Sequence, residues 1–197
     1  MRLVELAHEL VAPALASGDL AIDATCGNGL DTLFLASKVG PAGRVYSFDI
    51  QPQAIETTRA RLIREGLIKR VHLVLGTHSK LDFALQPEAA GKIKAVMFNL
   101  GYLPGGDKTI ITRAQSTLIA LEKASSLLSA RGRISVLCYT AHTGGQLETE
   151  RINAWLDGLP EDFAITRYRP ERRLQSPPEL IILERLKDSS STSPNRS

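Results

Sequence analysis

The stretch Ala21-Ile22-Asp23-Ala24-Thr25-Cys26-Gly27-Asn28-Gly29-Leu30-Asp31-Thr32 decides the fold of this 197-residue chain. Its apolar start predicts a strand that ends at Asp23. A tight turn with Gly27 and Gly29 follows, and a helix begins near Asp31. Glycine has no Cβ, so a ligand can approach the backbone of this turn closely. The N–H groups of the turn and of the helix start favour a polar or anionic ligand group. The stretch therefore predicts the first loop of a nucleotide-binding α/β fold.

Two interpretations of this loop differ in the nucleotide ligand that it would bind. A dinucleotide-binding loop has the pattern G-x-G-x-x-G or a final Ala, because the last small residue lets helix and strand pack closely. Here that position is Thr32, and Asp31 would repel a pyrophosphate. Asp31 would instead attract the ammonium group of S-adenosylmethionine (SAM). Asp23 followed by a short glycine loop resembles the pattern of class I SAM-dependent methyltransferases. A strand–turn–helix connection without a ligand is the structural alternative.

The length and composition indicate one globular domain with a substantial core, since 43% of the residues are hydrophobic and 23% are charged. Cys26 and Cys138 fall at predicted buried strand ends, which indicates a reducing compartment, most simply the cytoplasm, rather than disulfides. No Cys/His pair has metal-ligand spacing, so we expect no metal. We also expect no membrane association, because no apolar run is long enough to span a bilayer. The N-terminus carries acids within its apolar pattern, unlike a signal peptide.

Predicted strands and helices alternate along most of the chain. We expect strands at 20–24, 44–50, 71–75, 93–100, 133–139, 163–168 and 180–185, and helices at 3–16, 31–39, 52–66, 112–128 and 146–156. Pro13 should kink or end the first helix. This order predicts a single doubly wound, Rossmann-like α/β sheet, mostly parallel with an antiparallel last strand. The domain should cover residues 1–186, and the Ser-rich tail 187–197 should be disordered.

Right-handed crossovers place the loops after the first four strands along one edge of such a sheet. Ligands bind at that carboxyl edge, near the switch in strand order. Asp23, Asp49, His78 and Asn99 all map there. An acid at the position of Asp49 commonly accepts hydrogen bonds from ribose hydroxyls. His78 is a candidate contact for the adenine ring, although a surface or capping histidine is the alternative.

The second informative stretch follows the fourth strand: Asn99-Leu100-Gly101-Tyr102-Leu103-Pro104-Gly105-Gly106-Asp107-Lys108. It resembles the N-P-P-Y motif of amino-group methyltransferases, with Leu100 and Gly101 in place of the prolines. The resemblance implies that the Asn99 side chain and a backbone carbonyl accept hydrogen bonds from the target nitrogen, while Tyr102 stacks on the base. Such acceptors aim the lone pair of an amine at the methyl carbon. A glycine-rich turn that merely ends the strand is the alternative.

Together with Gln175-Ser176-Pro177-Pro178-Glu179-Leu180, these two stretches resemble the rRNA methylase family of the MnmM/YtqB type, over nearly the whole chain up to Leu186. The resemblance implies a SAM-dependent enzyme that methylates the 5-aminomethyl group of wobble (2-thio)uridine in tRNA. It also favours a homodimer. The segment Ala141-His142-Thr143-Gly144-Gly145 departs from the family, which usually has a proline where Thr143 stands.

This interpretation assigns a role to each candidate residue. The catalytic residues are Asn99, Tyr102, Asp107 and Asp31. The SAM-binding residues are Asp23, Thr25, Cys26, Gly27, Asn28, Gly29, Asp31, Asp49, Ile50, Gln51, Thr77, His78, Asn99 and Leu100. The substrate- or RNA-binding residues are Tyr102, Lys108, Tyr139, His142, Arg167, Arg169, Arg172 and Arg173.

The chemistry explains several of these choices. An alkylamine is mostly protonated at neutral pH, so Asp31, Asp107 or His142 could bind the ammonium and pass its proton to water. An unpaired anticodon base flips out at little cost, and Tyr102 or Tyr139 could stack on it. The arginines at 167–173 beside a Pro-rich loop favour phosphate contacts over a merely solvated surface.

Other functions remain open at this point. The enzyme could instead methylate rRNA or a small-molecule amine with the same SAM residues. A NAD-dependent oxidoreductase would share the glycine loop and Asp49, but Asp31 and the missing third glycine argue against it. A non-catalytic RNA-binding protein would need residues 99–108 only as a turn. The net charge of +3 permits an anionic partner without requiring one.

Overall fold

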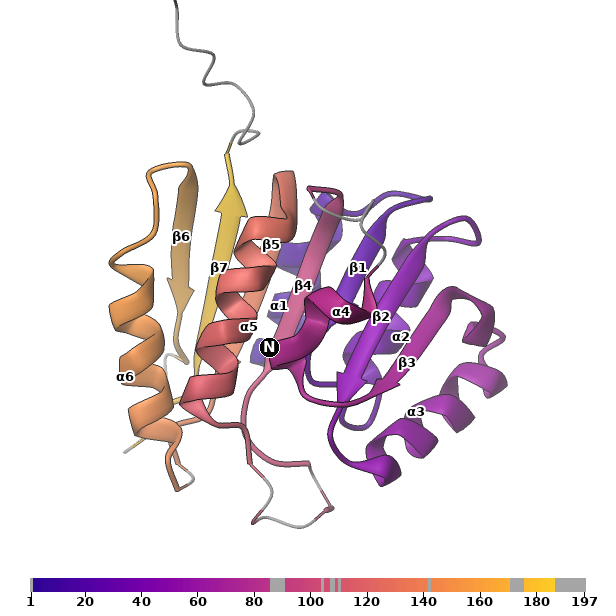
Figure 1. The fold of residues 1–197 in the computed structure, drawn as a ribbon, viewed down its shortest axis with the longest axis horizontal. Coiled ribbons are helices and arrows are strands. Elements are labelled where there is room, and N and C mark those ends of the chain that lie inside the picture. The colour runs from indigo at the N-terminus through magenta and orange to yellow at the C-terminus, as the bar shows by residue number, and fades with distance from the viewer. Residues whose placement is uncertain are drawn as a thin grey trace, which may run out of the picture.

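The computed structural model describes residues 2–85, 91–103, 105, 106, 109, 111–141, 143–170 and 176–186. Seven strands form one sheet in the order β3-β2-β1-β4-β5-β7-β6, and helices cover both of its faces (Figure 1). The strands are β1 (Leu20–Asp23), β2 (Arg44–Asp49), β3 (Val71–Leu75), β4 (Ile93–Asn99), β5 (Leu128–Cys138), β6 (Phe163–Tyr168) and β7 (Glu179–Arg185). The helices are α1 (Leu3–Val11), α2 (Leu30–Lys38), α3 (Pro52–Arg64), α4 (Leu81–Ala84), α5 (Ala114–Leu127) and α6 (Gly145–Leu156).

The strand directions confirm the predicted fold class. β1 pairs in parallel with both β2 and β4, β3 lies parallel to β2, and β5 lies parallel to β4. β7 is antiparallel to both of its neighbours, β5 and β6. The last strand therefore lies between the fifth and sixth strands instead of extending the sheet at its edge.

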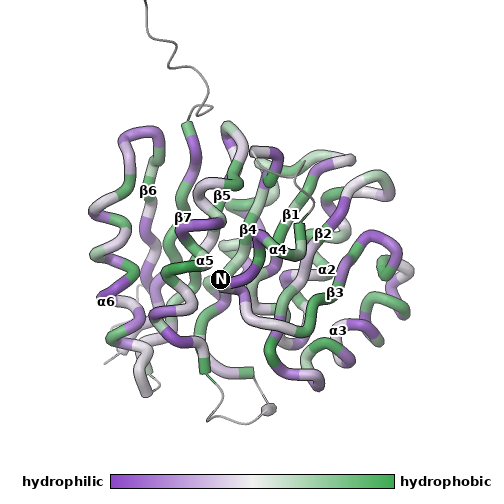
Figure 2. The backbone as a smooth tube through the Cα atoms, in the orientation of Figure 1, coloured by the Kyte–Doolittle hydropathy of each residue, from purple (hydrophilic) through white to green (hydrophobic). Residues whose placement is uncertain are grey.

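Two apolar layers enclose the sheet. On β4, Val96 and Phe98 face the core under α4, α5 and α6, whereas Ala95 and Met97 face the core under α1, α2 and α3. This alternation follows the two-residue period of a strand, and both faces are apolar because both are covered. Figure 2 shows hydrophobic stretches along the central strands and mixed character along the helices. Each fully buried large side chain, such as Phe98, contributes about 1.5–3 kcal/mol.

Pro13 ends the first helix as predicted: α1 ends at Val11 rather than at residue 16, and the 3-10 helix η1 (Ala12–Ala14) contains Pro13, which cannot continue the α-helical hydrogen bonds. Two other local features differ from the sequence predictions. β5 begins at Leu128 rather than at residue 133, because Ile93 pairs with Leu128 and the bulge at 129–132 replaces the predicted turn. The 3-10 helix η3 (His78–Lys80) and α4 follow β3 where only a loop was expected; a further 3-10 helix, η2 (Ile68–Arg70), precedes β3.

Within the described residues, no helix has the length and apolar character needed to cross a membrane. The same residues contain no group of three or more His, Cys, Asp or Glu side chains that could hold a metal ion. The predicted tail at 187–197 lies outside the described residues, so the domain boundary at residue 186 stays a prediction.

Candidate active site

The carboxyl ends of the parallel strands β3, β2, β1 and β4 meet at one edge of the sheet, the lower edge in Figure 1. The strand order reverses between β1 and β4, which is where ligands bind in sheets of this kind. Asp23 ends β1, Asp49 ends β2 and Asn99 ends β4, while His78 follows β3. The structure thus brings the four predicted strand-end residues to one edge.

The glycine loop after β1 is held by its neighbours. Gly27 and Gly29 have φ angles of +53° and +79°, where an L side chain is strained. The Gly27 amide donates a hydrogen bond to Asp49 Oδ2 across 2.8 Å. A Cβ on Gly29 would lie 2.5 Å from the hydroxyl oxygen of Thr58 on α3. The close approach of α3 and the left-handed backbone therefore both require glycine at position 29.

Asp23 supports this loop from inside the fold. Its side chain is fully buried; Oδ1 accepts from the Thr25 amide at 3.1 Å and Oδ2 from the Thr32 hydroxyl at 2.5 Å. The Thr32 hydroxyl also lies 2.7 Å from that of Ser47. Burial raises the pKa of Asp23 to about 8, and the charge of Asp31 adds to the increase. Burial therefore favours the protonated form of Asp23.

Asp49 links the first two loops of the edge. Its Oδ2 accepts from Gly27, and its Oδ1 accepts from the Gln51 amide at 2.9 Å. Burial raises the pKa of Asp49, while these backbone N–H groups act in the opposite direction. Ile50 beside it is 54% exposed, so the edge carries an apolar side chain next to the carboxylate. The predicted contact of Asp49 with ribose stays a prediction.

His78 lies deep in the loop region after β3. Its Nδ1 is 3.2 Å from the Ala24 carbonyl oxygen, and its ring meets that of Phe98 edge to face at 6.0 Å. Burial lowers the pKa of His78, so the ring is neutral at neutral pH. If Nδ1 donates to the carbonyl, Nε2 becomes an acceptor, and Nε2 has no hydrogen-bond partner among the described residues. Thr77 precedes it and caps η3 by accepting from the Ser79 amide.

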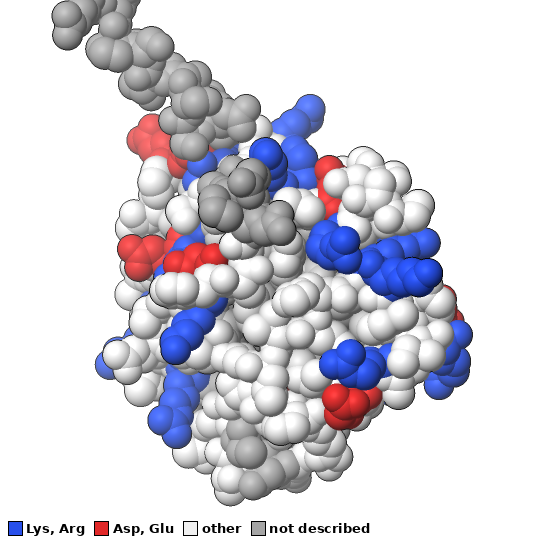
Figure 3. Space-filling model, turned by 45° about the vertical axis from the view of Figure 1, so that its right-hand side comes forward, with Lys and Arg blue, Asp and Glu red and all other residues white. Residues whose placement is uncertain are grey.

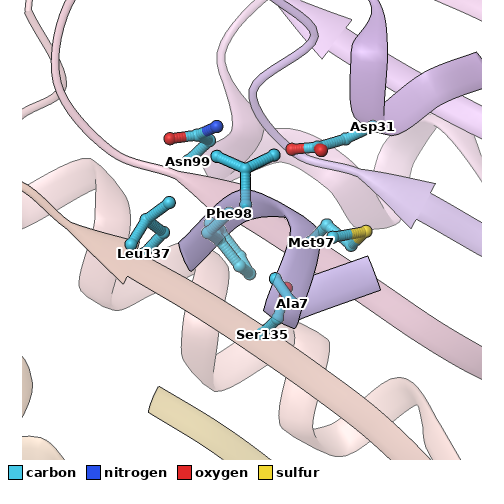
Figure 4. Close-up of a pocket in the computed structure, with 8 residues that line it drawn as sticks. Ala7, Asp31, Met97, Phe98, Asn99, Ser135 and Leu137 are labelled. Carbon is cyan, nitrogen blue, oxygen red and sulfur yellow. The ribbon is translucent and has the colours of Figure 1, made fainter. Parts of the chain in front are cut away.

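Asn99 and Asp31 flank a small cavity at the point where the strand order reverses. Figure 4 shows the two side chains on opposite sides of its mouth, Asn99 from the end of β4 and Asp31 from the start of α2. The other lining residues are Val4, Ala7, Met97, Phe98, Ser135 and Leu137. The backbone N–H of Asn99 donates to the Thr25 hydroxyl oxygen at 2.7 Å, and the backbone N–H of Leu100 donates to the Leu137 carbonyl at 2.9 Å. An amide acceptor and a carboxylate thus face one small volume.

Asp31 has a partner that the sequence did not reveal. His8 on α1 places Nε2 at 2.6 Å from Asp31 Oδ1, and its ring stacks on Phe34 with centroids 4.1 Å apart. The sequence signal for His8 was weak, since a single histidine within an apolar helical pattern is usually structural.

Tyr102 and Tyr139 follow the adjacent strands β4 and β5 and are 41% and 38% exposed. Burial and the charge of Asp31 raise the pKa of Tyr139. Both residues are thus partly exposed beside the edge that carries Asn99.

Two of the predicted RNA contacts already bind a carboxylate. Arg169 lies 3.0 Å and Arg167 lies 3.7 Å from the carboxylate oxygens of Glu179, whose side chain is only 4% exposed. Arg167 also donates to Asn153. Sequence reasoning missed Glu179, because β7 brings it beside these arginines only in the folded sheet. The predicted residues Asp107, Lys108, His142, Arg172 and Arg173 lie outside the described residues.

Cys26 and the hydroxyls around it form the buried underside of the glycine loop. Its thiol donates to Thr58 Oγ1 at 3.1 Å, and burial raises its pKa to about 12, so it is an inert thiol. Cys138 is likewise buried and free. Thr32, Ser47 and Thr58 carried no recognisable sequence signal, because no spacing distinguishes them from other hydroxyl residues.

Comparisons with known proteins bear on this site. The family model described as "Putative rRNA methylase" matches residues 45–184. The chain is 39% identical over 193 residues to the Arabidopsis thaliana "tRNA (mnm(5)s(2)U34)-methyltransferase, chloroplastic", covering 93% of this chain and 70% of that protein. A "putative rRNA-methylase" from Clostridium thermocellum is 40% identical with a TM-score of 0.87, covering 93% of this chain and 97% of the other. SMU.1697c, a "putative methyltransferase" of Streptococcus mutans in complex with SAH, is 34% identical with a TM-score of 0.84, covering 94% and 99%.

The glycine loop, the reversal of strand order beside Asn99 and these similarities agree with one another. The chain belongs to the rRNA methylase family, and it is a SAM-dependent methyltransferase.

Proposed function

We propose that this enzyme methylates the exocyclic amine of a modified wobble uridine in tRNA, converting 5-aminomethyl-(2-thio)uridine to 5-methylaminomethyl-(2-thio)uridine. The observation that supports this proposal most directly is that Asn99 and Asp31 line the same cavity, at the point where the strand order reverses between β1 and β4. An amide oxygen and a carboxylate suit a substrate nitrogen that arrives as an ammonium and must lose a proton. The Arabidopsis relative is named for a methyltransferase reaction at the tRNA wobble uridine.

The described residues fit SAM along the carboxyl edge. The backbone of Gly27 and Gly29 would hold its methionine end, and Asp49 would accept from the ribose hydroxyls. A contact between His78 and the adenine ring would require the loop after β3 to shift, because the unpartnered Nε2 of His78 is buried. When bound, SAM supplies an electrophilic methyl group.

The side chains at the cavity then prepare the amine. Asp31 attracts the ammonium group and takes up its proton, which leaves for solvent. The Asn99 side chain and the Leu100 carbonyl accept the remaining N–H groups and direct the lone pair toward the methyl group. Because the reacting methyl is intrinsically electrophilic, this orientation supplies much of the catalysis.

An exposed pair of aromatic rings suits a flipped base. Tyr102 and Tyr139 are partly exposed, and we propose that one of them stacks on the wobble uridine, which is unpaired in the free anticodon loop and costs little to extrude. The sequence pI of about 9.0 is compatible with an RNA partner, and basic side chains cover more of the face in Figure 3 than acidic ones do. The two buried free thiols fit a reducing compartment such as the cytoplasm. A homodimer would enlarge the RNA-binding surface.

The test is methyl transfer from labelled SAM to tRNA that carries 5-aminomethyluridine, compared with unmodified tRNA, rRNA and free alkylamines. Nucleoside mass analysis should find the label only as methylaminomethyluridine. Asn99→Ala should lower turnover by about a hundredfold and leave SAM affinity unchanged. Gln146→Ala, which removes an exposed amide paired with Glu150, is the matched control and should behave like the wild type. Label in rRNA or in the small amine instead would overturn the proposal.

A further inference from the structure

The chain that leaves β4 folds back on itself at the substrate side of the edge. The Gly101 N–H donates to the Thr112 hydroxyl oxygen at 3.0 Å, and the Thr112 N–H donates to the Gly101 carbonyl at 2.8 Å. Tyr102 and Ile111 form an antiparallel β-bridge beside them. The position of Thr112 therefore determines where Gly101 and the exposed ring of Tyr102 lie.

Glu148 on α6 holds Thr112 from the protein interior. Its Oε2 accepts from the Thr112 hydroxyl at 2.7 Å, and its Oε1 accepts from the Thr117 hydroxyl of α5 at 2.6 Å. Only 3% of the residue is exposed. A continuous series of hydrogen bonds thus joins two helices of the scaffold to Gly101, two residues after Asn99.

A buried carboxyl group at this position is expensive for stability. A buried carboxyl group loses its hydration, and hydroxyl donors compensate for that loss less well than a cation does. Among the described residues, no lysine or arginine forms an ion pair with Glu148; the nearby Arg167 pairs with Glu179. An apolar side chain would suit packing between α5 and α6 better. The hydrogen bonds of Glu148 lead instead to the loop that carries the candidate substrate residues.

We propose that Glu148 is a positioning residue, which acts through Thr112 and Gly101 to hold Asn99 and Tyr102 in the orientation needed for methyl transfer. The catalytic part of this inference rests on the proposed function. Without Glu148, the Thr112 hydroxyl loses its acceptor and the Gly101–Thr112 pair loosens. Misplacing the target nitrogen by about 1 Å can cost about a hundredfold in rate. The residues proposed for SAM at the glycine loop, Asp49 and His78 lie on other loops, so SAM affinity should not change.

The experiment compares Glu148→Ala and Glu148→Gln with Glu150→Ala, a matched control on the same helix whose side chain is exposed and pairs with Gln146. Hydrogen exchange without substrate should show faster exchange at the Gly101 and Thr112 amides in Glu148→Ala. The Leu100 amide, which is bonded to Leu137, should stay protected. In the methyl-transfer assay, kcat should fall about tenfold or more with KM for tRNA and SAM Kd within about twofold. Glu148→Gln should recover part of the rate, since its one carbonyl oxygen still accepts, and Glu150→Ala should match the wild type.

Unchanged exchange at Gly101 and Thr112 in Glu148→Ala would overturn the inference, as would faster exchange with an unchanged kcat. If Glu148→Ala does not fold, Glu148→Leu fills a similar space between α5 and α6, accepts no hydrogen bond and leaves the Thr112 hydroxyl in place for the Gly101 N–H, and the same outcomes apply. A wild-type enzyme that does not methylate the aminomethyl nucleoside contradicts the proposed function instead. The exchange measurement then still tests the link between Glu148 and the loop.

Discussion

His8 Nε2 lies 2.6 Å from Asp31 Oδ1, so the first helix of the chain contacts a wall of the candidate active site. The His8 ring also stacks on Phe34, one turn along α2 from Asp31, which limits how the imidazole can turn. Since Asp31 carries the proposed contact with the substrate ammonium, α1 contributes to the site as well as to the core.

We expect His8→Ala to reduce turnover by about tenfold, because a hydrogen bond to a charged group is worth about 1.5–3 kcal/mol and Asp31 would reorient without it. His8→Gln keeps an N–H donor and should retain part of the rate. Steady-state methyl transfer measures both variants. Glu9→Ala, an exposed neighbour on the same helix, is the control. Equal turnover in His8→Ala and wild type would show that the contact is only structural.

Gly29→Ala should unfold more readily and bind SAM more weakly. A left-handed backbone costs an L residue about 1–2 kcal/mol, and the new Cβ would also lie 2.5 Å from Thr58 Oγ1. Gly18→Ala is the matched control, because Gly18 has a φ of +98° and open space around it. Urea unfolding should therefore show a larger loss for Gly29→Ala than for Gly18→Ala. Similar losses for the two variants would mean that Thr58 yields without cost.

The raised pKa of Asp23 makes stability depend on pH. Folding raises this pKa from the ordinary 3.8 to about 8, so between these values the folded protein keeps a proton that the unfolded chain releases. Stability therefore falls as the pH rises from about 4 to about 8, with a slope of up to about 1.4 kcal/mol per pH unit.

Asp23→Asn removes this titration, so the variant should become more stable relative to wild type as the pH rises from 5 to 8, because only the wild type loses free energy of unfolding. Urea unfolding across that range measures the difference. Asp157→Asn, an exposed carboxylate on the surface, should run parallel to the wild type. Parallel curves for Asp23→Asn and the wild type would show that Asp23 is ionised in the folded protein.

Arg169→Ala should weaken tRNA binding. The slope of log KM for tRNA against log salt concentration should fall by about one unit, as expected for one lost phosphate contact. Its side chain is 65% exposed although it pairs with Glu179, so its guanidinium can reach a second anion. Arg64→Ala, at the far end of α3 and paired with Glu65, is the control. A drop in melting temperature with an unchanged salt slope would assign Arg169 to the Glu179 ion pair alone.

Much of the fold could be predicted because its signals are local. Apolar strands alternate with amphipathic helices along the chain, and parallel strands are joined by right-handed crossovers. The strands that end in Asp23, Asp49 and Asn99 therefore place these three residues at the same edge of the sheet. The left-handed turns at Gly27 and Gly29 were also predictable, since few other residues tolerate them. The bulge at 129–132 was not, because Arg131 and Gly132 have the composition of a turn in either case.

The sequence by itself determined the order of the seven strands and of the helices α1, α2, α3, α5 and α6, the glycine loop and the edge at which the site forms. Periodicity and turn chemistry act between neighbours in the chain, and the right-handed crossover then fixes which strand ends share an edge. Only the tertiary structure decided the partners of the site residues. Asp31 meets His8 across 23 positions, and Glu148 meets Thr112 across 36. No local pattern encodes such pairs, because the geometry that joins them exists only after α1, α5 and α6 have packed on the sheet.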